Sequence, residues 1–444
     1  MAVMSGRVRV LFDSLRGSYW LVPALMVAAA VLLSVLTSSL DLHIVPDTRG
    51  PWGRWMSTAG PEGARAVLTT IAASMITLAS LSYSLTLVAL TLAAGQYGPR
   101  LLRTFMRDRV TQVGLGAFLA TFVFCIGALR GVRSDGETSV VPHVSVAAAT
   151  TMAGLCLAYL VYFIHHVASS INATSVVAAA SRELMASLGD ARAERPRKDD
   201  VAPQPGPPPG AVPVHARSTG YVTVADHEGL VSIAEACDGQ MWVDVRPGDF
   251  VVEGDVLARL ACREGKPPLD DVRRALVLGA ERTMIQDVEF GVVQLVEVAL
   301  RALSPGINDP FTAIACVDRL SAALIAMAGR PPATTVLRDG SGTRRVTRLR
   351  VESFDGALRA AMDPLRQAAR TQVAVQIRLV EALARIGAAT RNVVQAGAVR
   401  RQLEMIARSA REAIPEPLDV DDVCARVDEA LAGLARARHD DDVT

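Results

Sequence analysis

Hydroxyl side chains recur at a regular interval in one of the most apolar parts of the chain. Thr70, Thr77, Ser84 and Thr91 are seven residues apart, and Ser74 falls between the first two at helical spacing. At about 100° per residue, these side chains share one helical face roughly 100° wide. Such a face could line an aqueous path between assembled copies. It could equally pack against other membrane helices through its hydroxyls, which is the commoner role.

A second set of polar residues interrupts an apolar stretch in the C-terminal half. An acid, an amide and a guanidinium beside a helix N-terminus could bind a small anion or phosphate. They could instead form a buried, paired network that holds helices or subunits together. We expect the network, with the last four residues mostly buried and bonded to one another. The set comprises Asp287, Gln294, Glu297, Arg301, Asn308 and Asp309.

The turn SPGINDPF follows the polar stripe. Asp309 is suited to cap the next helix, because Pro310 then occupies the first helical position, where its missing N–H costs nothing. The sequence therefore predicts a rigid turn between two helices.

No pattern in the sequence commits the chain to a reaction. A Ser–His or Cys–His nucleophile pair, a phosphate-cradling glycine loop and zinc-ligand spacing are all missing from the sequence. We therefore predict neither an enzyme nor a site for a metal or cofactor. The cysteines are far apart without a CxxC pair, and we interpret all six as ordinary buried residues: Cys125, Cys156, Cys237, Cys262, Cys316 and Cys424.

Four long runs without a charged residue predict four membrane-spanning helices. They cover residues 18–40, 66–99, 110–129 and 138–181, and about 20 apolar residues suffice to cross the hydrocarbon core. Since no ionisable residue interrupts any run, a proton-coupled pump is disfavoured. The second run would be about 50 Å long if wholly helical, so it should tilt or project beyond the bilayer.

The arginines predict which way the spans are oriented. Seven lie at the N-terminus and between the second and third runs, against five in the two opposite loops. This bias favours a multi-pass protein of the bacterial inner membrane with both termini in the cytoplasm. Trp52 and Trp55 resemble an interfacial segment on the outer surface. The arginines are dispersed rather than striped along one face, so nucleic acid is not an expected partner.

The expected fold is a membrane α-helical region of four spans, a small β-rich domain and a mostly α-helical cytoplasmic region. The boundaries are 1–188 for the membrane region, 189–211 for a Pro-rich linker, 212–265 for the β-rich domain and 266–444 for the helical domain. The fourth span should continue as one helix past His165 and His166, for which an interfacial structural role is the simpler interpretation. In the last domain, we expect a helix over 270–278, an exposed hairpin that turns at Asp339-Gly340 and one long helix over 354–385.

Two long blocks resemble a known family. LSYSLTLVALTLAAGQYGPRLLRTFMRDR and QDVEFGVVQLVEVALRALSPGINDPFTA are similar to the hallmark blocks of a bacterial family of predicted membrane proteins with a domain of unknown function. The resemblance covers almost the whole chain and implies four spans with a cytoplasmic C-terminal part. It implies no activity and carries over no functional residues.

Two functional hypotheses follow. The first is a homo-oligomeric channel or pore whose cytoplasmic part gates it, based on the hydroxyl face and on spans without buried charge. The second is a non-conducting membrane sensor or scaffold that binds a small ligand or a protein partner. The expected partners are the lipid bilayer and further copies of the chain, and a membrane enzyme is the weakest alternative.

Overall fold

The computed structural model describes residues 19–43, 60–97, 108–135, 138–170, 172–190, 204–263, 265–331 and 333–441. The chain divides into two compact units. One consists of residues 12–95 and 99–175, and is called the apolar unit below. The other consists mainly of residues 176–444, and is called the C-terminal unit. Trp52, Trp55 and most of the predicted linker lie outside the described residues.

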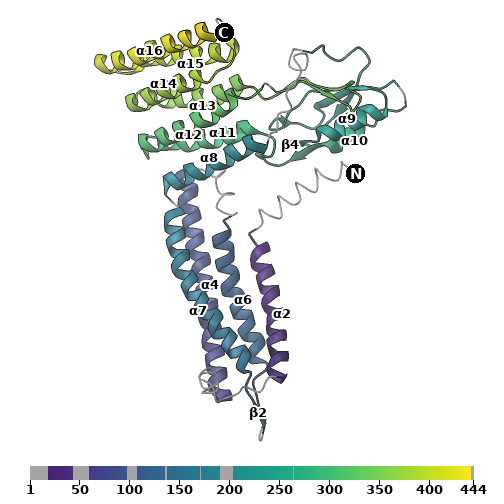
Figure 1. Ribbon diagram of the computed structural model, residues 1–444, viewed down its shortest axis with the longest axis vertical. Coiled ribbons are helices and arrows are strands. Elements are labelled where there is room, and N and C mark those ends of the chain that lie inside the picture. The colour runs from purple at the N-terminus through teal and green to yellow at the C-terminus, as the bar shows by residue number, and fades with distance from the viewer. Residues whose placement is uncertain are drawn as a thin grey trace. The chain divides into compact units, whose positions relative to one another are not determined.

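The apolar unit contains long hydrophobic helices (Figure 1). They are α2 (Leu21–His43), α4 (Pro61–Tyr97), α6 (Arg109–Leu129) and α7 (His143–Ser170), with a small hairpin of β1 (Arg133–Asp135) and β2 (Thr138–Val140) before α7. Each of the four predicted uncharged runs overlaps one of these helices over most of its length, and each helix is long and apolar enough to cross a membrane.

Helices α2 and α6 approach closely because α6 presents glycines to α2. A Cβ on Gly116 would lie 2.6 Å from Met26 Sδ and 3.1 Å from Pro23 Cα. A Cβ on Gly127 would collide with the Ser34 hydroxyl. Small residues let membrane helices pack backbone to backbone in this way. Helix α4 instead meets its neighbours through larger side chains, among them Phe118, Phe124 and Phe163.

The fourth run is not one continuous helix. Helix α7 ends at Ser170, and α8 (Ala173–Asp190) begins after a break in which the Asn172 side chain accepts a hydrogen bond from Thr174 N. The expectation of an unbroken helix was therefore wrong. An asparagine offers the backbone a local bond that competes with the helix ladder, and it commonly caps a new helix start.

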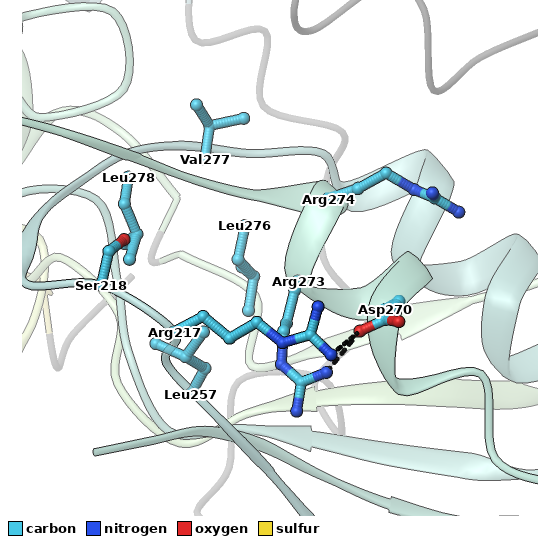
Figure 2. A pocket seen from close by; sticks show the side chains of 9 residues that line it. All are labelled: Arg217, Ser218, Leu257, Asp270, Arg273, Arg274, Leu276, Val277 and Leu278. Atoms are coloured by element: carbon cyan, nitrogen blue, oxygen red, sulfur yellow. Dashed lines mark hydrogen bonds and ion pairs between the residues drawn. The ribbon is translucent and has the colours of Figure 1, made fainter. Parts of the chain in front are cut away.

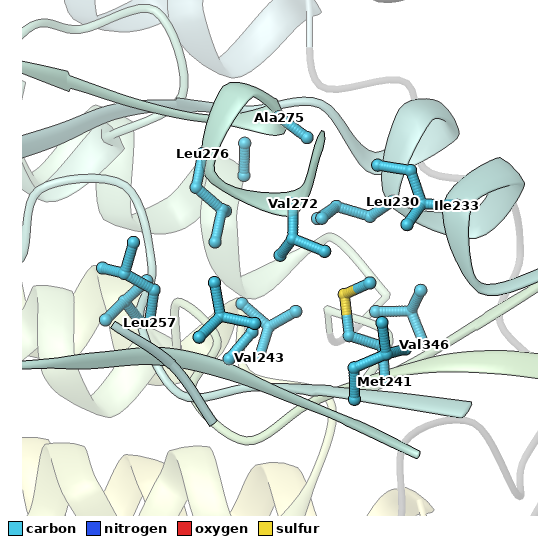
Figure 3. Close-up of a cluster of buried hydrophobic side chains, with 14 of the residues drawn as sticks. Leu230, Ile233, Met241, Val243, Leu257, Val272, Ala275, Leu276 and Val346 are labelled. Carbon is cyan, nitrogen blue, oxygen red and sulfur yellow. The ribbon is translucent and has the colours of Figure 1, made fainter. Parts of the chain in front are cut away.

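The C-terminal unit begins with a β-rich part that has two sheets. One has the order β3-β7-β5-β10-β9 and the other β6-β4-β8. The strands are β3 (Val212–His215), β4 (Gly220–Ala225), β5 (Gln240–Val243), β6 (Phe250–Val251), β7 (Val256–Ala261), β8 (Leu276–Gly279), β9 (Val336–Arg338) and β10 (Arg344–Arg348), with helices α9 (His227–Ala236) and α10 (Leu269–Ala275). Figure 3 shows their shared core, in which Leu230, Met241, Leu257 and Val272 are almost wholly buried.

Two predictions for this part were wrong. The hairpin that turns at Asp339-Gly340 is not an exposed excursion, because β10 pairs in parallel with β5 and Val346 is fully buried in the core. The predicted helix over 270–278 ends at Ala275, and the next residues form β8 against β4. In both cases pairing partners more than 50 residues away in the chain override the local pattern.

The remaining helices of the C-terminal unit form two rows (Figure 1). Helices α11, α13 and α15 pack in one row, and α12, α14 and α16 pack in the other. Their bounds are α11 (Val288–Ala302), α12 (Pro310–Ala328), α13 (Phe354–Ala368), α14 (Val373–Ala388), α15 (Val393–Ala413) and α16 (Pro417–Asp441). Helix α12 is a fifth helix with the length and hydropathy of a membrane span, and it packs against α11, α13 and α14.

The long helix predicted over 354–385 is two helices. The chain breaks between Ala368 and Val373, where the fully buried Gln376 donates to Ala369 O at 3.3 Å and Arg370 O at 2.6 Å. Its side-chain amide satisfies carbonyls that a continuing helix would have bonded itself. The break places α14 in the other row.

Two of the six cysteines are not ordinary buried residues. Cys237 follows α9, Cys262 follows β7, and the two form a disulfide with Cα atoms 5.3 Å apart. The interpretation of all six as unpaired was wrong for this pair. Their separation of 25 residues gives no motif, so only the fold brings them together.

Candidate functional site

The hydroxyl face of α4 points away from the rest of the apolar unit. Its residues are all exposed in the single chain: Thr70, Ser74, Thr77, Ser84 and Thr91. The buried side chains of α4 lie on the opposite side of the helix at about 100° per residue, and comprise Ala64, Leu68, Ala72, Met75, Ser82 and Ala89 among others. Within one chain, nothing described covers the hydroxyl face.

Several of these hydroxyls bond to their own helix. Ser74 donates to Thr70 O at 2.8 Å, Thr77 to Ala73 O at 2.9 Å and Thr91 to Val88 O at 2.8 Å. The donors are thereby satisfied inside the span, which an apolar environment demands. The oxygen atoms keep lone pairs that can accept a bond from a neighbouring helix or from water.

The side chains exposed on the other spans are different in kind. Those of α2 and α7 are mostly large and aliphatic, as on a surface that faces lipid: Leu25, Leu32, Val35, Leu155, Leu157 and Val161. The hydroxyl face of α4 also carries the exposed small residues Ala66 and Ala73, and the exposed aliphatic residues Leu81 and Val88. Small and hydroxyl-bearing residues are typical of helix contacts in membranes, so the hydroxyls are what distinguish this mixed face from those of α2 and α7.

The polar stripe of α11 and its following turn does not form one cluster. Asp287 begins α11 and is paired with Arg282, whereas Arg301 lies in the last turn of the same helix, about 20 Å further along at 1.5 Å per residue. Gln294 is buried between them, and Glu297 is half-buried. The six residues therefore do not meet at one site.

The turn itself differs partly from the expectation. Asp309 caps α12, accepting from Thr312 N at 3.1 Å and Thr312 Oγ1 at 2.5 Å, and Pro310 is the first helical residue, as predicted. The Thr312 hydroxyl is the main reason that the pKa of Asp309 lies below its ordinary value. Asn308 is exposed with φ of 47° and accepts from Gln372 Nε2 at 3.3 Å. Asn308 thus occupies a left-handed turn position at the surface. The prediction that it is buried in a clasp was wrong.

A different charged cluster surrounds the first turn of α11, which we call the α11 junction. Arg246 makes a bidentate pair with Glu289, at 2.9 and 2.6 Å, and Arg282 makes one with Asp287, at 2.8 and 3.0 Å. Glu352 accepts from Val288 N at 2.9 Å. Segments from three parts of the sequence meet here, and for that reason spacing along the chain could not reveal the cluster.

Burial and the neighbouring arginines act in opposite directions on the pKa values of the carboxyl groups in the α11 junction. Burial is the main cause that raises the pKa of Glu352 to about 7, and the neighbouring Asp287 and Glu289 raise it further. The bond from Val288 N and the charge of Arg246 oppose this effect. Burial also raises the pKa of Asp287, against the pull of Arg282. The junction thus contains a carboxyl that can change protonation near neutral pH.

His166, for which a structural role was expected, contacts the residue that caps α6. His166 Nε2 lies 2.8 Å from Asp108 Oδ2, and Asp108 caps α6 by accepting from Val110 N at 3.2 Å. The Tyr162 ring stacks on the His166 ring. These contacts fasten α7 to the start of α6, in keeping with a structural histidine. Among the described residues, no group of three or more potential ligands could hold a metal ion.

Comparison with known proteins gives one consistent result. A family model described as "Predicted membrane protein (DUF2254)" matches residues 16–385, a range that includes α4, α11 and the α11 junction. Uncharacterized proteins of Mycobacterium bovis and Mycobacterium tuberculosis are each 32% identical over 429 residues, which cover 94% of this chain and 80% of theirs. No solved structure matches.

Proposed function

Because this chain belongs to the DUF2254 family of predicted membrane proteins, we propose a function within the membrane, as a homo-oligomeric channel gated by its C-terminal unit. The copies assemble through the hydroxyl face of α4. The assembled faces then line a polar path across the bilayer. The observation that carries the proposal is that this face is exposed in one chain while the opposite side of α4 is buried.

Three further features support assembly through α4. The face carries five exposed hydroxyls among small and aliphatic residues, whereas the exposed faces of α2 and α7 are mostly aliphatic. Its hydroxyl donors are satisfied inside the helix, while their oxygens can still accept bonds from water. Helix α4 also lacks the close backbone approach that joins α2 to α6, so it retains a free side for a second copy.

We assign gating to the C-terminal unit because one of its carboxyl groups can change its protonation near neutral pH. The carboxyl of Glu352, whose pKa is raised to about 7, can change the charge of the α11 junction at neutral pH. The spans are placed in the bacterial inner membrane with both termini in the cytoplasm, on the strength of the arginine distribution. Labelling from outside the cell at a cysteine introduced for the exposed Gly206 should fail, and successful labelling would refute this orientation.

The alternative is a non-conducting sensor whose spans anchor the C-terminal unit. The specific observation that favours it is the α11 junction, since ion pairs that join three chain segments can convert a bound ligand or proton into a shift of helices. A sensor needs no continuous polar path, and therefore no particular copy number.

Copy number separates the two functions most directly. Native mass measurement of the purified full-length protein should give an oligomer, because spans joined by short loops enclose a pore only when several copies meet. A monomer would remove the channel and leave the sensor.

Cross-linking identifies the face that assembles. A cysteine in place of Thr77 should give a covalent dimer under mild oxidation, because Thr77 is exposed on the proposed contact face. Val161 of α7, at 71% exposure, is the matched control on an aliphatic face, and its cysteine variant should give no covalent dimer. Flux of a small ion from vesicles should then fall when Thr77 is replaced by Leu. Equal cross-linking at both positions would contradict assembly through α4.

A further inference from the structure

The C-terminal unit contains a pocket of about 380 Å³ that none of the features above explains (Figure 2). Its lining comes from the loop before β4, from α10, and from β7 and β8. Leu278 is partly exposed and gives the pocket an apolar side, whereas Leu257 and Leu276 are 1% exposed and belong to the core behind it. The volume falls within the range of pockets that bind small ligands.

Two guanidinium groups converge on one carboxylate at this pocket. Asp270 Oδ1 lies 2.9 Å from Arg217 Nη2 and 2.5 Å from Arg273 Nη1. Arg273 is held further by a bond from its Nε to His215 O at 2.8 Å, and only 20% of its side chain is exposed. Arg274 also belongs to the lining and pairs with Asp271. Three arginines and one aspartate line the pocket, so its charge is positive.

We propose that this pocket binds a phosphate monoester whose ester group is apolar or aromatic. The phosphate is bound by Arg217 and Arg273 in place of Asp270, and the ester group lies against Leu278. The site does not depend on whether the chain conducts ions. The C-terminal unit would bind this ligand whether the protein is a channel or a sensor.

The ligand class follows from the charge and shape of the two sides. A phosphate monoester carries a charge of about −1.5 to −2 at neutral pH and offers three acceptor oxygens, which matches two converging guanidiniums better than a single carboxylate does. Arginine forks bind phosphate with charge-assisted, directional bonds. Inorganic phosphate alone would leave the exposed part of Leu278 in water, so the ester group should add affinity.

Asp270 acts as an internal competitor for the ligand. Its side chain is 60% exposed and that of Arg217 is 71% exposed, and ion pairs of this kind contribute little to stability. The carboxylate can therefore swing away without unfolding the unit. Removing its charge should strengthen binding of an anion, whereas removing an arginine should weaken it.

Titration calorimetry on the full-length protein in detergent tests the site with three probes: inorganic phosphate, phenyl phosphate and dihexanoyl phosphatidic acid. We expect phenyl phosphate to bind about tenfold more tightly than inorganic phosphate, with an affinity that falls as salt rises. Preference for the phosphatidic acid assigns the ligand to a lipid headgroup. Preference for phenyl phosphate assigns it to a soluble phosphate ester.

Variants make the test specific to the pocket. Arg217→Ala should weaken binding of the preferred probe about tenfold, and Asp270→Asn should strengthen it severalfold. Arg263→Ala is the matched control, because Arg263 is 84% exposed and does not line the pocket. Binding that is unchanged by Arg217→Ala, equal for inorganic and phenyl phosphate, or weakened by Asp270→Asn would overturn the proposal.

Discussion

Asp41, in the last turn of α2, caps the first turn of α7 by accepting hydrogen bonds from Ser145. Its Oδ2 lies 3.1 Å from Ser145 N and 2.6 Å from Ser145 Oγ, and its Oδ1 accepts from Val144 N at 2.7 Å. One carboxylate thus satisfies two backbone N–H groups of another helix, where the helix dipole favours negative charge.

Asp41→Ala should therefore lower the free energy of unfolding by about 1–2 kcal/mol, measured as a lower melting temperature in detergent. Ser39→Ala is the matched control, because Ser39 is exposed and bonds only to Val35 O of its own helix among the contacts described. A variant at Asp41 that melts like the control would show that the cap contributes nothing.

The close approach of α2 and α6 predicts strong sensitivity at Gly116. Leucine there must displace Met26 and the backbone at Pro23, and overpacking of this kind costs about 1–3 kcal/mol. Gly116→Leu should reduce thermal stability and the yield of folded protein. Gly154→Leu, on α7, should have little effect, because nothing lies within 4 Å of a Cβ at that position.

Glu352 predicts a pH dependence of stability. An unfolded chain releases this proton near the ordinary value of 4.5, whereas the folded chain holds it until about pH 7. The free energy of unfolding should therefore fall as pH rises between these values, by at most about 3 kcal/mol, and then level off.

Melting temperatures of Glu352→Gln across that pH range check this prediction. Most of the pH dependence should disappear, since glutamine keeps an acceptor for Val288 N and loses the titrating group. Glu404→Gln, at an exposed pair with Arg400, should retain the wild-type profile. An unaltered slope in Glu352→Gln would assign the effect to other carboxyls.

The disulfide between Cys237 and Cys262 predicts sensitivity to reductants. Because it closes a loop of 25 residues, its loss should cost about 3 kcal/mol on the chain-entropy account. Replacing both cysteines by serine should lower the melting temperature of the C-terminal unit and make it indifferent to dithiothreitol. Cys424→Ser, at an unpaired cysteine, should melt like the wild type and still respond to the reductant.

The turn before α12 predicts a smaller effect. Asp309→Ala should lower the free energy of unfolding by about 1 kcal/mol, through loss of the cap on Thr312 N. Because the pKa of Asp309 is depressed in the folded chain, the contribution of its charge should be present near neutral pH and fade as pH falls through the depressed value. Ile307→Ala, at an exposed residue of the same turn, is the control for thermal melts.

The sequence predicted features that one segment determines alone. Each uncharged run predicted an apolar helix because a span satisfies its own backbone and needs only length and hydropathy. The Asp309 cap and Pro310 were likewise readable, since capping depends on adjacent residues. The α4 hydroxyl stripe could be placed on one face by periodicity, although only the structure shows that this face is exposed.

Most of the features that were missed require partners far away in the chain, whereas the helix breaks at Asn172 and before Gln376 are local. Hairpin β9–β10 follows a local pattern, but its pairing with β5 is decided about 100 residues earlier in the chain. The bonds from Gln376 to carbonyls of the preceding turn carry no sequence signature. Arg246 and Glu289, and likewise Cys237 and Cys262, become neighbours only when strands and helices assemble. No single-sequence pattern ranks such pairs above other arginines, acids and cysteines.

The two rows of helices have a mechanical consequence. Each helix from α11 to α16 contacts mainly its neighbours in the row and in the chain, so the helices form an array that extends in one direction. In arrays of this kind, stability accumulates interface by interface and unfolding proceeds in steps. A small rotation imposed at α11 can be shared among successive interfaces instead of breaking one of them. The array is therefore an elastic element, stiff along each helix and compliant along the direction in which the helices stack.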